Sequence, residues 1–185
     1  MTHTESPLSR WMLKLENARP LDAAVGMVQP AIKAVASNST VRAALQGRWL
    51  GHAAHPVVVM APIGLWTSAA VLHSTGMPEA QRPAQLLTGM GIMGALPATL
   101  TGLAEVAAGA DEKVKRVAVV HATLNTLALG LEVGSWLSGK AGNRAMSKFD
   151  SFAALTVTMV SGYLGGHMSI ARKYGTRDEA FDAAQ

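Results

Sequence analysis

Four of the six histidines in this 185-residue chain lie at the ends of long apolar segments: His52, His55, His121 and His167. Imidazole is costly to bury in hydrocarbon, and it is a good ligand for haem iron and for transition metals. Several imidazoles that converge at one depth of a membrane would therefore form a candidate cofactor site. Because the chain contains no cysteine, histidine, carboxylate or backbone groups would have to hold any metal.

The composition favours a membrane protein. Hydrophobic residues make up 49% of the chain and charged residues 15%, whereas about 25% of a typical soluble domain is charged. The formal net charge is +4, but the lysines and arginines are scattered between apolar segments. Anionic lipid headgroups are therefore a better partner than nucleic acid. Residues 1–20 lack the continuous apolar core of a secretory signal, so membrane insertion would depend on internal segments.

Four segments are long and apolar enough to cross a bilayer, which takes about 20 residues. They cover residues 56–75, 84–104, 117–137 and 152–171. We expect an all-α fold in which these segments form a four-helix transmembrane bundle, within a membrane domain over residues 51–171. A soluble helical bundle would instead carry charged stripes at helical spacing, and these segments have none.

The segments on either side of the bundle differ in character. Residues 1–50 contain apolar positions at helical spacing, such as Leu8, Trp11 and Leu15. They predict short amphipathic helices that lie in the membrane interface, and the alternative is a cytosolic helical extension that packs on the bundle. Residues 172–185 are expected to form a flexible tail.

The number of crossings places both termini and the connection between the second and third spans on one side of the membrane. That side carries twelve of the sixteen lysines and arginines. The positive-inside rule identifies such a side as cytoplasmic. We therefore expect a multi-pass protein of the cytoplasmic membrane with both termini inside.

The same topology brings the four histidines to the cytoplasmic face. With a rise of 1.5 Å per residue, His121 lies about 6 Å into the third span and His167 about 6 Å before the end of the fourth. Both would lie inside the bundle, so they are the pair expected to supply the axial ligands of a haem iron. Asn125 and Glu105 reach the same face, and each could orient an imidazole through its second ring nitrogen.

The opposite face carries a second polar pair. His73 ends the first span, and Glu132 lies in the third span about 16 Å deeper than His121. A hydrogen bond between these two side chains would satisfy both. Glu132 is the only ionisable group deep in a span, so a proton or ion pathway, which usually needs a chain of such groups, is disfavoured.

Residues 48–66, RWLGHAAHPVVVMAPIGLW, resemble the signature of the bacterial membrane family known as domain of unknown function 2231 (DUF 2231), with its G-H-x-x-H-P and P-I-G-x-W motifs. The segments LPATLTGLAE, RVAVVHATLN, SW and YLGGH follow in the order that the family shows. The chain departs from the family at His73, where Asp is frequent, and at Glu105 and Val106, where an Asp-Trp pair is frequent. The resemblance covers about residues 20–170.

This resemblance implies a four-span integral protein of a bacterial membrane. It also implies a redox setting, because relatives of the domain occur fused to Rieske-type iron–sulfur domains. One hypothesis is thus a redox-associated subunit that binds haem b or a transition metal through the histidines and exchanges electrons with a quinone or a partner protein. The other is a non-enzymatic structural or accessory subunit whose histidines only tie helix ends together. The residue types do not select one metal, and they leave homo-oligomerisation open.

Overall fold

The computed structural model describes residues 6–181, and this part of the chain is helical, with an isolated bridge between His52 and Arg177 in place of any β-sheet. The α-helices before the bundle are α1 (Pro7–Glu16), α2 (Asp22–Ala36) and α3 (Ser39–Gln46). The remaining ones are α4 (His55–Val58), α5 (Met60–Ser74), α6 (Gln81–Val106), α7 (Glu112–Lys140) and α8 (Arg144–Gly166). A π-helical turn, His167–Ala171, follows α8, and 3-10 turns cover Arg19–Leu21, Arg48–Leu50, Pro78–Ala80 and Glu179–Phe181.

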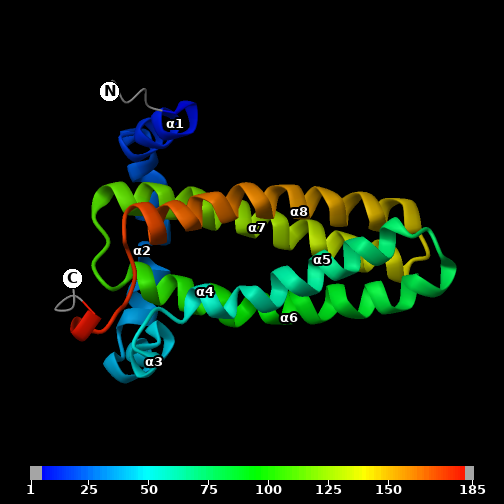
Figure 1. Cartoon of the computed structure of the whole chain (residues 1–185), viewed down its shortest axis with the longest axis horizontal. Helices are drawn as coiled ribbons and strands as arrows, with labels where there is room; N and C mark the ends of the chain where they lie inside the picture. Colours follow the sequence, from blue (N-terminus) through cyan, green and yellow to red (C-terminus); the bar gives the residue numbers. More distant parts are fainter. Residues whose placement is uncertain (1–5, 182–185) are drawn as a thin grey trace.

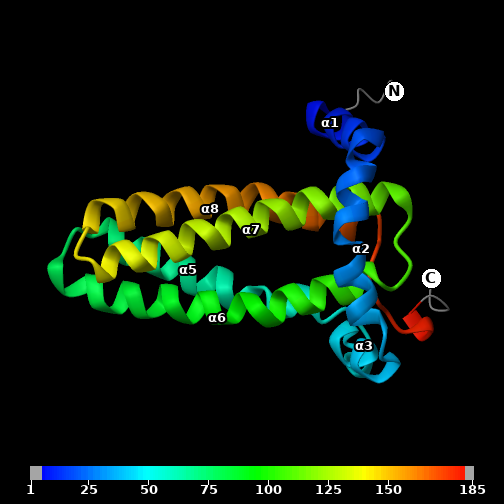
Figure 2. The same ribbon diagram turned by 180° about the vertical axis from the view of Figure 1, so that it is seen from behind.

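Helices α5, α6, α7 and α8 form an elongated bundle in which successive helices run in opposite directions (Figure 1). We call the end with the α5–α6 and α7–α8 connections, residues 75–80 and 141–143, the hairpin end. At the other end, the terminal end, α4 begins, α6 ends, α7 begins and α8 ends. Helices α1, α2 and α3 and the C-terminal 3-10 turn also lie there (Figures 1 and 2).

Three segments of the described residues are long and apolar enough to cross a membrane: His55–Ser74, Pro78–Val106 and Glu112–Lys140. They correspond to the first three predicted spans. The first is divided into α4 and α5 around Val59, because Pro62 has no N–H to donate to the carbonyl of Val58.

Helix α8 differs from the predicted fourth span, residues 152–171. It begins at Arg144, because the Asn143 side chain accepts a hydrogen bond from the N–H of Met146 at 3.1 Å and caps the helix there. Its first turns carry Arg144, Lys148 and Asp150, and the uncharged part of the helix begins only after them. The regular helix ends at Gly166, and the residues after it form the π-helical turn.

Small residues fill the interior of the bundle, and large apolar residues cover its outside. Ala69, Ala84 and Ala154 are completely buried. Met93 is 66% exposed and Met159 76% exposed, and the other outward-facing large apolar side chains include Val71, Leu86, Met90, Leu96, Leu127, Leu137, Phe149 and Phe152. Small interior residues let helices approach closely in lipid, and an apolar exterior of this extent suits a hydrocarbon surrounding.

Helix α2 crosses the outer faces of α6 and α7 at the terminal end (Figure 2). It buries Val25 and Ile32, while Met27 on its outer side is 82% exposed. Helix α1 contacts α7, and α3 contacts α6. The N-terminal helices therefore form a transverse layer against the end of the bundle that holds most of the histidines.

Candidate functional site

His55 and His121 are the two predicted site residues that the structure brings together. His55 is the first residue of α4 and His121 belongs to α7; their ring centroids are 6.3 Å apart and the ring planes are inclined by 85°. Nδ1–H of His55 donates to the carbonyl of Ala98 at 2.9 Å. The pair thus joins the start of the first span to the third, and through Ala98 to α6.

Both ring nitrogens of His121 are engaged by the protein. Nδ1–H donates to the carbonyl of Ser161 on α8 at 2.8 Å, and the Ser161 hydroxyl lies 2.9 Å from the same nitrogen. Nε2 accepts a hydrogen bond from the side-chain amide of Asn125 at 3.0 Å. Asn125, one turn along α7, is therefore the residue that orients this imidazole.

Two glycines provide the space for these rings. A Cβ atom on Gly102 would lie 3.0 Å from Cε1 of His55, and one on Gly165 would lie 3.2 Å from Cε1 of His121. Both contacts are closer than ordinary van der Waals distance. The rings consequently pack directly against the backbones of α6 and α8, and the space that the glycines leave is already filled by imidazole.

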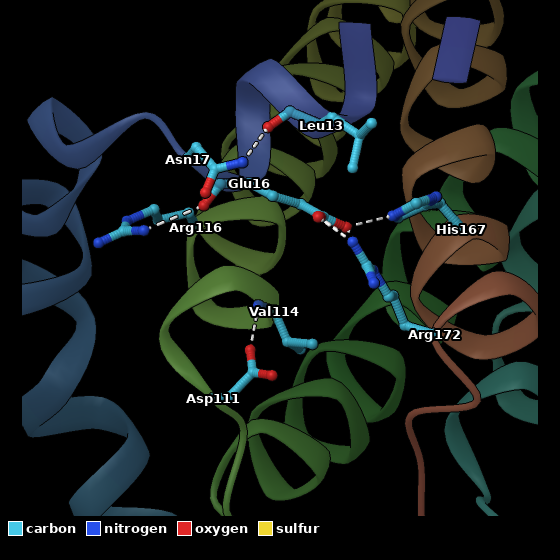
Figure 3. A network of polar contacts seen from close by, with 8 residues as sticks. All are labelled: Leu13, Glu16, Asn17, Asp111, Val114, Arg116, His167 and Arg172. Carbon is cyan, nitrogen blue, oxygen red and sulfur yellow. Dashed lines mark hydrogen bonds and ion pairs between the residues drawn. The ribbon is translucent and has the colours of Figure 1, made fainter. Parts of the chain in front are cut away.

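His167 belongs to a different group, centred on Glu16 (Figure 3). Glu16 ends α1 and is 1% exposed. Its carboxylate accepts hydrogen bonds from Nε2 of His167 at 2.7 Å and from Nε of Arg172 at 2.6 Å, and Nη2 of Arg172 contacts the other carboxylate oxygen. We call Glu16, His167 and Arg172 the terminal ion cluster; it fastens α1 to the segment after α8.

The partners of Glu16 in the terminal ion cluster stabilise the ionised form of its carboxylate. Burial by itself raises the pKa of Glu16, but the hydrogen bonds and positive charge of Arg172, together with His167, outweigh this effect and hold the pKa below its usual value. Arg116 adds a neighbouring contact: its guanidinium donates to the main-chain carbonyl of Glu16 at 3.0 Å and to both carboxylate oxygens of Asp22.

Sequence reasoning missed Glu16 and Arg172. The available signal was helical spacing, because Met12 and Glu16 are four residues apart and therefore share one face of α1. Met12 is 1% exposed, so the carboxylate stands on the buried face of the helix. An acidic residue on the apolar face of an amphipathic helix predicts a cationic partner, although it does not identify that partner.

Glu105 contacts the C-terminal segment. Its Oε2 accepts a hydrogen bond from the N–H of Thr176 at 2.8 Å, its main-chain carbonyl accepts one from the Tyr174 hydroxyl at 2.5 Å, and its Oε1 is buried without a hydrogen-bond partner among residues 6–181. Burial, followed by the nearby carboxylates of Glu105 and Asp111, raises the pKa of Tyr174 to about 12. Glu105 therefore holds the start of the predicted tail, and the hydrogen bonds of its carboxylate are not to an imidazole.

His52 lies apart from the other histidines. It is exposed in the loop before α4, its Nδ1–H donates to the carbonyl of Ala53 at 3.1 Å, and its backbone forms the isolated bridge to Arg177. The four histidines are thus held by three separate sets of contacts. Among residues 6–181, no group of three or more His, Cys, Asp or Glu side chains is arranged to hold a metal ion.

At the hairpin end, His73 is 3% exposed and Glu132 is completely buried. The hydrogen bond predicted between them does not form: both ring nitrogens of His73 and both carboxylate oxygens of Glu132 lack partners in the described part of the chain. The reason is depth, because His73 and Gly139 line the same pocket and Glu132 lies about two turns further into α7 than Gly139. Thr88 and Ser151 add two more buried hydroxyls without partners.

The comparison with protein families identifies a family of membrane proteins. The model of the family described as "Predicted membrane protein (DUF2231)" matches residues 51–178, which includes all four long helices and the four histidines. No curated protein and no solved structure matches the chain.

Proposed function

The chain belongs to the DUF2231 family of predicted membrane proteins, and from this premise we propose that it crosses the bilayer four times, with α4 and α5 together as the first span and α6, α7 and α8 as the others. Three of these helices are apolar enough by composition alone. The proposal for α8 is supported by its outward-facing Phe149, Phe152 and Met159, which continue the apolar exterior of the bundle. Residues 51–171 then form the membrane domain.

The transverse layer lies at the membrane surface in this proposal. Helix α2 runs crosswise to the spans (Figure 2), as a helix in the plane of the interface would. Its outward side presents Met27, Pro30 and Ala31 and only one lysine, Lys33, and an apolar face of this kind can enter the headgroup region. By the positive-inside rule, the terminal end faces the bacterial cytoplasm.

This topology is tested with single cysteines, since the natural chain has none. Met77→Cys and Ala141→Cys place a thiol at the hairpin end, and Lys113→Cys places one at the terminal end. In intact cells, an impermeant maleimide should label the first two variants and spare the third. Labelling of only one hairpin-end variant would contradict four crossings, and labelling of only Lys113→Cys would reverse the orientation.

For its role, the protein is a structural or accessory membrane subunit whose histidines tie the helices of the terminal end together. One observation carries this proposal: His121 uses both ring nitrogens within the chain, one on Ser161 of α8 and one on Asn125. A partly buried imidazole with both nitrogens satisfied is a stable structural element. His55 and His167 act in the same way on α6 and α1.

The test is His121→Ala in detergent-purified protein. Lost hydrogen bonds and the cavity left behind should lower the free energy of unfolding by about 2 kcal/mol, and the metal content and absorption spectrum should equal those of the natural protein. His52→Ala is the matched control, because His52 is exposed and should leave stability unchanged. A Soret band or stoichiometric metal that disappears in His121→Ala would contradict a purely structural role.

A second function, binding of a redox-active metal, is supported by the His55–His121 pair. Each ring donates Nδ1–H to a backbone carbonyl, the arrangement that orients metal-binding histidines. A haem b does not fit here, because both rings pack against glycine backbones and Asn125 occupies Nε2 of His121. A single ion could lie between the rings only after Asn125 withdraws; metal analysis of natural protein and of His55→Ala tests this alternative, and a quinone or electron-transfer partner would be relevant only if metal is found.

A further inference from the structure

A polar pocket of about 300 Å³ lies at the hairpin end, away from the histidines of the proposed structural site. It is lined by residues from all four long helices and the connections between them, among them His73, Gln81, Arg82, Gln85, Arg144 and Ser147. Because the exterior of the bundle is apolar, a polar hollow between its helix ends is an unusual feature of this molecule.

The charge of the pocket has one sign. Arg82 and Arg144 line it, and no acidic side chain does. Neither arginine forms a salt bridge in the part of the chain that the structure describes. Both belong to the first turn of a long helix, α6 and α8 respectively, so the positive ends of two helix dipoles add to the two guanidinium charges.

The buried imidazole of His73 gives an independent indication that this pocket binds a ligand. It is 3% exposed, and neither of its ring nitrogens has a hydrogen-bond partner among residues 6–181. Leaving a buried polar group without a partner costs about 1–3 kcal/mol, so such groups in folded proteins usually have a partner in a ligand, an ion or water. His73 lines the same pocket as the two arginines, and its N–H can donate to whatever occupies it.

We propose that this pocket binds an oxyanion of the phosphate type through Arg82, Arg144 and His73. The planar guanidinium fork matches the oxygens of a phosphate group and binds them with charge-assisted hydrogen bonds. Such a group can belong to a lipid headgroup, because the pocket lies where the spans end, or to a phosphate ion in solution. Both sources present the same chemistry to the pocket.

The experiment uses the full chain, delipidated in a neutral detergent, with isothermal titration of two probes. One probe is inorganic phosphate, and the other is a short-chain phosphatidylglycerol below its micellar concentration. The natural protein should bind at least one of them. The double variant Arg82→Gln/Arg144→Gln should bind it at least about tenfold more weakly, because it loses two charge-assisted contacts. Saturation by phosphate identifies a soluble ligand, and binding of the lipid alone identifies a headgroup.

Lys140→Gln is the matched control. Lys140 also lies at the hairpin end, where its amine is 4.1 Å from the centre of the Trp136 ring, and it does not line the pocket. Its replacement removes one positive charge near the site and should leave affinity unchanged. An equal loss of affinity in Lys140→Gln and in the arginine variant would show general attraction of anions and would overturn the proposal, as would a natural protein that binds neither probe.

His73→Phe provides a second test that does not depend on the arginines. This change removes two unpartnered nitrogens and keeps a buried ring of similar size, so the ligand-free protein should unfold at the same or a higher temperature. Binding of the probe should nevertheless weaken. If His73→Phe binds the probe as tightly as the natural protein does, His73 takes no part in the site and the proposed set of contacts is wrong.

Discussion

Both ends of the bundle contain histidine and glutamate side chains that pack between helices, but the two ends differ in how these side chains are hydrogen-bonded. At the terminal end, the carboxylate of Glu16 meets Arg172 and His167, and His121 has a partner for each ring nitrogen. At the hairpin end, His73 is 3% exposed and Glu132 is completely buried, yet they have no hydrogen-bond partner among the described residues. Glu16 and Glu132 therefore share residue type and burial and differ in pairing, and Oε1 of Glu105 is the one buried carboxylate oxygen described at the terminal end that also lacks a partner.

The difference in hydrogen bonding distinguishes polar groups that stabilise the fold from polar groups that are available to bind a ligand. A buried polar group that is satisfied within the chain contributes to stability, and removing its partner exposes the full cost of burying it. A buried polar group without a partner lowers stability, so its presence needs another reason, such as a ligand or ordered water. The terminal end should therefore lose stability when its polar groups are removed, and the hairpin end should lose binding instead.

The largest effect is expected from Glu16→Gln at the terminal end. The amide has the same size but no charge, so it removes the buried carboxylate that Arg172, 37% exposed, and His167, 14% exposed, both contact. We expect the free energy of unfolding to fall by about 2 to 3 kcal/mol, measured by thermal or denaturant unfolding in detergent. Glu112→Gln is the control, because its salt bridge with Lys115 is exposed and should contribute less than about 0.5 kcal/mol.

Acid should weaken the terminal end through the same carboxylate. The pKa of Glu16 lies below its usual value of 4.5 because Arg172 and His167 outweigh the effect of burial. Its contribution to stability is thus fully present above about pH 4.5 and is lost as the pH falls through the lower pKa of the folded state. The gap in melting temperature between natural protein and Glu16→Gln should close over this range; a gap independent of pH would assign the effect to something other than charge.

The first three spans could be predicted from the sequence because hydropathy is a local property. The start of helix α8 could not be predicted from hydropathy, since Arg144, Lys148 and Asp150 make its first turns polar. The cap was nevertheless present in the sequence: Asn143 directly precedes the helix and accepts the N–H of Met146. Attention to this helix cap would have predicted that α8 begins at Arg144, eight residues before the apolar span of residues 152–171.

Side-chain pairing was much harder to predict than the helices. Glu16 and Arg172 are 156 residues apart, and their contact depends on how α1 packs against α7 at the terminal end. The His73–Glu132 hydrogen bond was wrong for a related reason: a count of crossings gives the face of the membrane, but it does not give the depth at which side chains from two helices meet. Asn125 and His121 were predictable because four residues on one helix fix their geometry.

Glu132→Met should have the opposite sign from Glu16→Gln. The methionine fills a similar volume and removes two carboxylate oxygens that have no partner in the described part of the chain. We expect the free energy of unfolding to rise by about 1 to 2 kcal/mol. A decrease comparable to that of Glu16→Gln would mean that Glu132 is satisfied by bound water or an ion, and the two ends would then differ less than their contacts indicate.

The smallest effect concerns the packing of the rings at the terminal end. Gly165→Ala places a methyl group 3.2 Å from Cε1 of His121, whereas Gly162→Ala, one turn earlier on α8, meets nothing within 4 Å. Alanine favours a helix over glycine by about 1 kcal/mol, so Gly162→Ala should be neutral or stabilising in thermal unfolding. In Gly165→Ala this gain should be cancelled or reversed, because His121 is held by Ser161 and Asn125 and cannot move away freely. Equal melting temperatures for the two variants would show that the imidazole is loosely held, which would remove the main support for its structural role.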